Sequence, residues 1–171
     1  TEYGELPLGY DHKYVYSHLG YNLKATDMQA AIGCAQLDKF PSFVERRRHN
    51  FARLKAALAD CTDKLILPEA APHSNPSWFG FLITCKEGTD RNAAVQYIES
   101  KGVQTRMLFA GNLTKHPCFD QMRASGKGYR IAGSLENTDR IMKDTFWIGV
   151  YPGMTDEMLQ AMADAIKDAL N

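Results

Sequence analysis

The sequence has no apolar run that approaches the roughly 20 residues that a membrane-spanning helix needs. It also lacks an excess of either charge, because 20 basic residues balance 20 acidic ones over 171 residues. Without a basic surplus, the chain has no overall attraction for nucleic acid or for an anionic membrane. Its first 20 residues are polar and rich in tyrosine, unlike the basic and apolar segments of a secretory signal. We therefore expect a cytoplasmic protein that binds neither nucleic acid nor a membrane.

Cysteine is scarce, and its spacing fits no common metal site. Cys34, Cys61, Cys85 and Cys118 stand singly, with no C-x-x-C pair and no histidine at ligand spacing. Four reduced thiols in a reducing compartment are therefore a better interpretation than a metal centre or a set of disulfides. We predict no metal ligand in this chain.

Motifs that bind phosphate or activate a nucleophile are missing as well. The Gly-Lys-Gly segment at 126–128 matches neither G-x-x-x-x-G-K-[ST] nor G-x-G-x-x-G. The five histidines are dispersed, and each taken alone is best read as a surface or packing residue. His116 is the exception, because it lies in a long loop near Arg106, Asn112 and Lys115, where polar groups could converge on an anionic ligand.

What the sequence does contain is an unusual segment at residues 19–40, LGYNLKATDMQAAIGCAQLDKF. A turn leads into a helix that begins at Thr26, where Thr26 and Gln29 form the T-x-x-Q pattern of a capping box. Two sets of small and apolar residues then recur at helical spacing and define two faces. The first face consists of Met28, Ala31, Ile32 and Ala35, and the second of Ala30, Gly33, Cys34 and Leu37. A helix that is apolar on two sides is predicted to be buried on two sides, so we interpret it as the seam with another body of protein.

The rest of the chain mixes helices and strands. We expect helices at 41–59, from Thr89 or Asp90 to about 100, at 119–123, at 135–143 and after a cap at Thr155. We expect strands at 65–67, 78–85, 103–108 and 146–150. On the 41–59 helix, the predicted solvated face consists of Glu45, Arg46, Arg48, His49 and Asn50. The order lacks the regular alternation of a Rossmann unit, so the predicted class is α+β, with a sheet of three or four strands and helices on one face.

The first 21 residues carry five tyrosines, which is too aromatic for a disordered tail. Residues 13–18 alternate enough to form a short strand. Two interpretations stay open: an arm that packs on its own domain, and an arm that lies against another domain or subunit.

The segment at 16–37 resembles the G-x-N-[YFL]-[RK]-x-[TS]-[DE]-x-Q-A-A-x-G-x-x-Q-L signature of the DegT/StrS-type sugar aminotransferases. Lys115-His116-Pro117 before an aromatic residue, and YPGMTDE at 151–157, are similar to later landmarks of that family. These are vitamin B6 enzymes of fold type I, the aspartate aminotransferase fold, that act on nucleotide-linked keto-sugars. The resemblance implies that this chain is the C-terminal third of a longer enzyme. Residues 1–25 would be an arm or linker from a large domain, and residues 26–171 the small C-terminal domain.

Within this family, the sequence looks most similar to the CDP-4-keto-6-deoxyglucose 3-dehydrase branch. That branch uses pyridoxamine phosphate, a [2Fe–2S] cluster and a partner reductase to make 3,6-dideoxysugars of lipopolysaccharide. A departure at Phe79 supports this branch, since the aminotransferases usually have a histidine in the corresponding [WH]-H-x-[FY] pattern. An apolar ring has thus replaced a titratable side chain.

The resemblance also implies roles for individual residues. Asn22 would reach across a homodimer to the cofactor phosphate, and Lys24 would add positive charge there. Phe79, Arg106 and His116 would border the sugar nucleotide. The catalytic lysine or histidine and the cluster cysteines would lie in the large domain, so we expect no catalytic residue here. The chain alone would bind no cofactor and would be inactive.

Two alternatives remain open at this stage. One is the same domain of a pyridoxal-phosphate-dependent sugar aminotransferase, which Phe79 argues against. The other is a free-standing α+β interaction domain without a cofactor, which the seam helix and the tyrosine-rich arm argue against.

Overall fold

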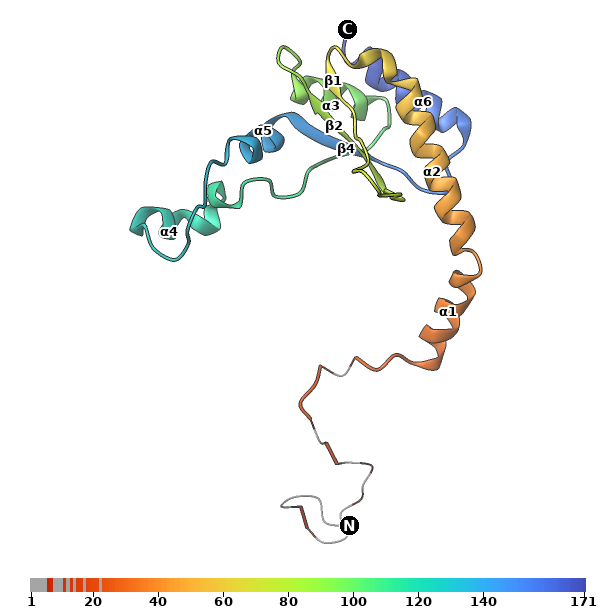
Figure 1. The fold of residues 1–171 in the computed structure, drawn as a ribbon, viewed down its shortest axis with the longest axis vertical. Coiled ribbons are helices and arrows are strands. Elements are labelled where there is room, and N and C mark those ends of the chain that lie inside the picture. Colours follow the sequence, from red (N-terminus) through yellow and green to blue (C-terminus); the bar gives the residue numbers. More distant parts are fainter. Residues whose placement is uncertain (1–5, 8–10, 12, 14, 17, 22) are drawn as a thin grey trace. The chain divides into compact units, whose positions relative to one another are not determined.

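The structure is a computed structural model that describes residues 6, 7, 11, 13, 15, 16, 18–21 and 23–171. The chain divides into two compact units, Thr1–Asp38 and Lys39–Asn171 (Figure 1). Within the described residues, no helix combines the length and the apolar character needed to cross a membrane.

In the first unit, the described residues include the α-helix α1 (Asp27–Leu37). The predicted capping box is confirmed: the Thr26 hydroxyl accepts a hydrogen bond from the Gln29 amide, and the Thr26 amide donates to the Gln29 side chain. None of the α1 residues is buried, and Met28 and Ile32 are exposed. The seam therefore stays a prediction. The strand expected at 13–18 includes residues outside the described set, and its described residues form no strand.

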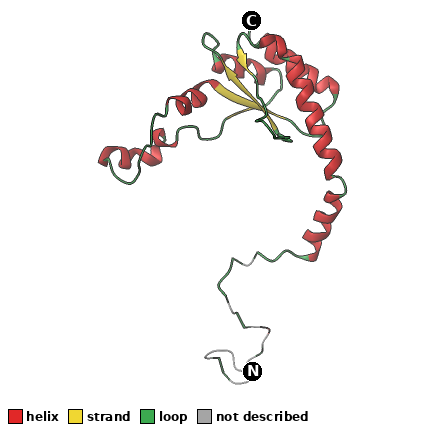
Figure 2. Ribbon diagram, viewed as in Figure 1, coloured by secondary structure: helices red, strands yellow, loops and turns green. Residues whose placement is uncertain are grey.

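The second unit mixes helices with short strands in the predicted order (Figure 2). Its longer helices are α2 (Phe40–Ala57), α3 (Arg91–Ser100), α4 (Asp120–Ser125), α5 (Glu136–Asp144) and α6 (Asp156–Asp168). Its strands are β1 (Leu65–Ile66), β2 (Gly80–Cys85), β3 (Thr105–Met107) and β4 (Thr145–Gly149). Single turns of 3-10 helix lie at Ala59–Cys61, Leu113–Lys115 and Pro117–Phe119. Side-chain caps at Asp90 and Thr155 begin α3 and α6, as their sequences predict.

The four strands form one antiparallel sheet in the order β1-β2-β4-β3. Phe81 lies opposite Ile148, and Leu82 opposite Trp147. Because side chains alternate along a strand, this register places Phe81 and Ile148 on one face of the sheet and Leu82 and Trp147 on the other. The predicted α+β class and the four-stranded sheet are thus confirmed.

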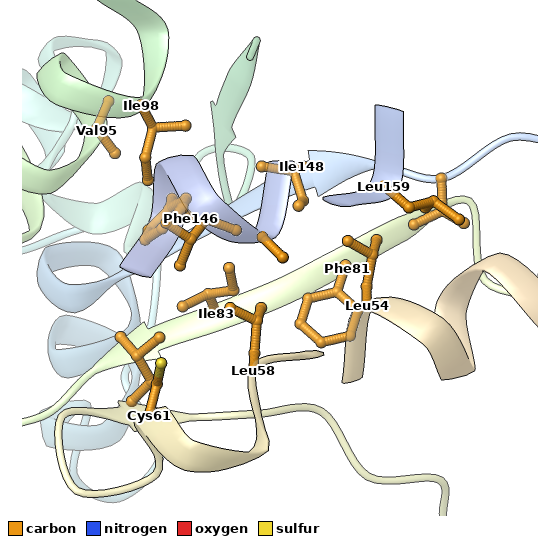
Figure 3. Close-up of a cluster of buried hydrophobic side chains, with 14 of the residues drawn as sticks. Leu54, Leu58, Cys61, Phe81, Ile83, Val95, Ile98, Phe146, Ile148 and Leu159 are labelled. Carbon is orange, nitrogen blue, oxygen red and sulfur yellow. The ribbon is translucent and has the colours of Figure 1, made fainter. Parts of the chain in front are cut away.

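The core fills the space between the sheet and helices α2, α3 and α6 (Figure 3). Phe81 and Ile83 of β2, together with Phe146 and Ile148 of β4, supply its sheet side. The helices contribute Leu54, Val95, Ile98 and Leu159 among others, and Leu58, which follows α2 directly, joins them. All of these side chains are at most 9% exposed, so burial of apolar area accounts for the packing of the helices on this face.

One expectation about α2 is wrong. Asn50, assigned from the sequence to a solvated face, is 0% exposed. Its side-chain amide donates to the carbonyl of Tyr151 at 2.8 Å. Arg46 donates to the carbonyl of Met154, and Arg48 to those of Asn75 and Pro76. This side of α2 therefore holds two loops, because backbone carbonyls that lack strand partners need donors.

Candidate functional site

The face of the sheet opposite the core carries a cluster of aromatic side chains. Trp147 of β4 lies at its centre, opposite Leu82 on one side and Arg106 on the other. The Phe79 ring stands almost perpendicular to the Trp147 ring, with 5.5 Å between centroids and an interplanar angle of 87°. The Phe109 ring lies 6.4 Å from the Trp147 ring at 48°. We call Phe79, Phe109 and Trp147 the aromatic corner.

Backbone features hold Trp147 in this position. The indole N–H donates to the carbonyl of Met107 at 3.1 Å. Gly80 allows the ring to lie against β2, since a Cβ on this residue would stand 2.7 Å from Trp147 Cε3. Phe109 has a φ of 47°, a left-handed conformation that is uncommon for a bulky residue. Such conformations cost free energy and are concentrated at functional sites.

The aromatic corner opens onto a cavity of about 370 Å³. Its other walls come from Pro68, Glu69, Trp78, Gly80, Leu82 and Leu108. The single charged side chain among them, Glu69, is paired with the Lys55 ammonium at 2.5 Å. Apart from this mostly exposed carboxylate, the side chains that line the cavity are apolar or aromatic.

Arg106 lies beside a second cavity, of about 520 Å³, which shares Trp147 with the first. Three methionines and Tyr151 contribute to its wall. The guanidinium donates to the carbonyl of its neighbour Thr105 at 3.1 Å, and Arg106 forms no ion pair among the described residues. Phe79 and Arg106, both implied to border the substrate, thus flank the same indole ring.

The polar groups around His116 have structural roles. The buried Asn112 side chain donates to the Asp139 carboxylate at 2.7 Å, and Lys115 pairs with the same carboxylate at 2.9 Å. These contacts join the long loop after β3 to α5. Both lower the pKa of Asp139, the hydrogen bond from Asn112 by more than the one from Lys115. His116 Nε2 lies 2.6 Å from the carbonyl oxygen of Ala110. His116 is absent from the walls of both cavities around Trp147, so the structure does not bring it together with Arg106 there, and its role at the substrate stays a prediction.

Of the two residues implied for the cofactor, Asn22 lies outside the described residues. Lys24 is described and exposed in the first unit. Both assignments stay predictions.

The cysteines do not gather into a cluster site. Cys61 and Cys85 are buried, whereas Cys34 and Cys118 are exposed. Burial raises the pKa of Cys85 to about 11, and it also raises that of Cys61. Over the part of the chain that the structure describes, no three acidic, histidine or cysteine side chains could together hold a metal ion. These thiols therefore do not fit the ligand set of an iron–sulfur cluster.

The place of Trp147 was not predicted from the sequence. FWIGV at 146–150 indicated only a strand, and Phe109 was assigned to no site. In the structure, both tryptophans of the chain line the first cavity, and Gly80 lies diagonal to Trp147 in the register. Only the strand pairing shows that these residues meet.

Comparison with known proteins places the chain in a family. Residues 4–167 match the model of the DegT/DnrJ/EryC1/StrS aminotransferase family. The chain is 53% identical, over 167 residues, to the lipopolysaccharide biosynthesis protein RfbH of Salmonella typhimurium. It is 50% identical over 167 residues to a dTDP-4-dehydro-2,6-dideoxy-D-glucose 3-dehydratase of Saccharopolyspora spinosa. Each match covers 96% of this chain, but only 37% and 35% of the respective relatives, so the chain spans about a third of their length.

The fold has solved counterparts as well. An Escherichia coli GDP-4-keto-6-deoxy-D-mannose-3-dehydratase, with bound hydrated PLP, matches 93% of this chain with a TM-score of 0.74. The match covers 39% of that chain at 24% identity, so it supports the fold alone. The family model, the two relatives and the fold agree with the resemblance of the 16–37 segment. The chain belongs to the DegT/DnrJ/EryC1/StrS aminotransferase family.

Proposed function

We propose that this chain is the C-terminal part of a 3-dehydrase that removes the C3 hydroxyl of CDP-4-keto-6-deoxy-D-glucose. The enzyme would depend on pyridoxamine phosphate and a [2Fe–2S] cluster, and it would act in the synthesis of 3,6-dideoxysugars for the O-antigen. The observation that carries the proposal is the 50% identity, over 96% of this chain, to a sugar-nucleotide 3-dehydratase. The 53% identity to a lipopolysaccharide biosynthesis protein supports a role in the synthesis of lipopolysaccharide sugars.

The environment of Phe79 supports a dehydrase over an aminotransferase. The Phe79 ring is 60% exposed and stands against Trp147 at the mouth of an apolar cavity. A phenyl ring cannot hold or move a proton, whereas the histidine expected there in aminotransferases can. This side of the substrate site would therefore exclude water and orient the sugar without taking part in proton transfer.

The chain would contribute binding and orientation to the reaction. Arg106 carries a permanent positive charge that suits the diphosphate of a nucleotide sugar. Asn22 and Lys24 would donate to the cofactor phosphate of the neighbouring subunit. When bound, the B6 cofactor supplies the electron sink for breaking the C3–O bond, and the cluster supplies electrons. The other residues that hold these groups would lie in the large domain.

The proposal implies several partners. They are the large N-terminal domain, a second copy of the enzyme in a homodimer, the CDP-sugar and a reductase. Without the large domain the chain would be inactive and would bind no cofactor.

The full-length gene product that contains this chain tests the proposal. It would be incubated with CDP-4-keto-6-deoxyglucose, pyridoxamine phosphate and a reducing system, and the sugar would be analysed by mass spectrometry. Loss of the C3 oxygen, with a B6 absorbance band and a broad iron–sulfur shoulder in the 300–600 nm spectrum, is the expected result. An amino sugar formed with glutamate as donor would instead identify an aminotransferase. A protein that shows neither absorbance feature and leaves CDP-4-keto-6-deoxyglucose unchanged under both conditions would contradict both assignments.

A further inference from the structure

Two rings of the aromatic corner meet at nearly a right angle instead of lying parallel to each other. Phe79 and Trp147 are at 87° to each other, so a flat ring could stack on only one of them. A bulky aliphatic group, by contrast, would contact both rings at once. The third ring, Phe109, is 75% exposed and extends the same wall.

The walls of the cavity provide few groups for hydrogen bonding. The Trp147 N–H is already bonded to Met107. The Glu69 carboxylate pairs with Lys55 through one oxygen, and its side chain is 76% exposed, so it stays hydrated at the edge of the cavity. Among the remaining lining side chains, only the indole N–H of Trp78 is polar. A nucleobase is recognised by several hydrogen bonds at its edge, which these few groups cannot supply. A hydroxyl group held against the aromatic rings would lose hydrogen bonds to water and gain none from these rings.

We propose, resting on the function proposed above, that the aromatic corner receives the C5–C6 edge of the sugar. It would select a 6-deoxyhexose, whose C6 is a methyl group, against a hexose that carries a hydroxyl at C6. The methyl group and the C5–H bond present an aliphatic edge that matches two perpendicular aromatic walls. Trp147 is then a specificity-determining residue, and Gly80 positions it.

Binding of two matched ligands tests this inference in the full-length protein. CDP-6-deoxyglucose and CDP-glucose differ only in the C6 hydroxyl, and neither has the 4-keto group needed for turnover. Calorimetry would give their dissociation constants, with CDP alone as the reference. Tryptophan fluorescence provides a second readout, since both tryptophans of this chain line the cavity. We expect the 6-deoxy sugar to bind roughly 10- to 100-fold more tightly, the discrimination that an apolar pocket achieves against an added hydroxyl.

Two variants report on the aromatic corner. Trp147→Ala should bring the affinity ratio close to one. Phe109→Gly should lower the ratio as well, and it is compatible with the fold because glycine readily adopts the φ of 47°. Tyr97→Ala, on α3 and away from both cavity walls, is the control and should keep the wild-type ratio.

The other outcomes separate this inference from the proposed function. If the protein binds CDP and has equal affinity for both sugars, the inference is overturned and the proposed function is not. Phe109 lines the first cavity and not the one beside Arg106, so weaker binding of CDP itself to Phe109→Gly would mean that the corner holds part of CDP, which also overturns the inference. If CDP and both sugars fail to bind the wild-type protein, both the proposed function and the inference are contradicted.

Discussion

The side-chain amide of Asn50 donates to the backbone carbonyl of Tyr151 at 2.8 Å, joining α2 to the turn that precedes α6. Asn50 is completely buried, and its own Oδ1 has no hydrogen-bond partner. Arg46, one helical turn earlier, donates to the carbonyl of Met154 in the same turn. Two side chains of α2 therefore fix the segment that connects β4 to α6.

Replacing Asn50 should destabilise the second unit. Asn50→Ala leaves the Tyr151 carbonyl buried without a donor, so the free energy of unfolding should fall by about 1–3 kcal/mol. Urea denaturation followed by circular dichroism would measure the change. The neighbouring exposed residue provides the control, because His49→Ala should change stability by no more than about 0.5 kcal/mol. Equal effects of the two substitutions would show that the buried hydrogen bond contributes nothing.

Gly80 and Gly149 form a matched pair for testing the packing of Trp147. They lie opposite each other in the register of β2 and β4. A Cβ at Gly80 would stand 2.7 Å from the Trp147 ring, whereas a Cβ at Gly149 would meet nothing within 4 Å. Gly80→Ala should therefore reduce stability by about 1–3 kcal/mol through overpacking, and Gly149→Ala should not. Thermal denaturation of the two variants would compare them, and a larger loss for Gly149→Ala would refute the contact.

The pH dependence of stability should report on Asp139. Its pKa is lowered from the ordinary value of 3.8 by hydrogen bonds from Asn112 and Lys115. A group with a lowered pKa in the folded state stabilises the protein above its unfolded pKa and loses this contribution as the pH falls through the folded pKa. Wild-type stability should therefore fall more steeply than that of Asp139→Asn between about pH 5 and pH 2.

Denaturant titrations across this pH range would give the two slopes. Asp63→Asn, at an exposed position, serves as the control and should run parallel to the wild type. Parallel curves for Asp139→Asn and the wild type would show that the ties between the long loop and α5 do not depend on this carboxylate.

The four cysteines should differ in reactivity toward a thiol reagent. Cys85 is buried with its pKa raised to about 11, so at about pH 8 it is almost wholly protonated and out of reach. Cys61 is buried with a raised pKa as well. We expect Cys118 to react rapidly in the native protein, and Cys61 and Cys85 to react only after unfolding. Cys118→Ser should remove one rapidly reacting thiol, and uniform reactivity of all four native thiols would contradict this arrangement.

Much of the fold was predictable because it depends on local rules. The capping box at Thr26 and the caps at Asp90 and Thr155 involve residues two or three apart. The strand at 78–85 was recognisable from its apolar and aromatic residues, although the observed strand begins at Gly80. The strand at 13–18 stays a prediction, since it includes residues outside the described set.

The candidate site was predictable only in part. Phe79 and Arg106 do lie on one side of the sheet around Trp147. The long-range partner of Asn112 and Lys115 was not predicted: Asp139, which lies 27 and 24 positions later in the chain, binds both and secures the loop. The role of His116 in substrate binding stays a prediction. Sequence spacing reveals which polar groups are close along the chain, but not which of them have already found partners.

The sequence by itself determined the family, through the long motif at 16–37, and the α+β class, through residue periodicity and capping. Both are encoded in short stretches, where the identity of a few neighbouring residues is enough. Only the tertiary structure decided that Asn50 is buried, that Trp147 lies at the centre of an aromatic corner, and that Asn112 and Lys115 are structural. Each of these depends on contacts between residues distant in the chain, and it is strand pairing and helix packing that bring them together.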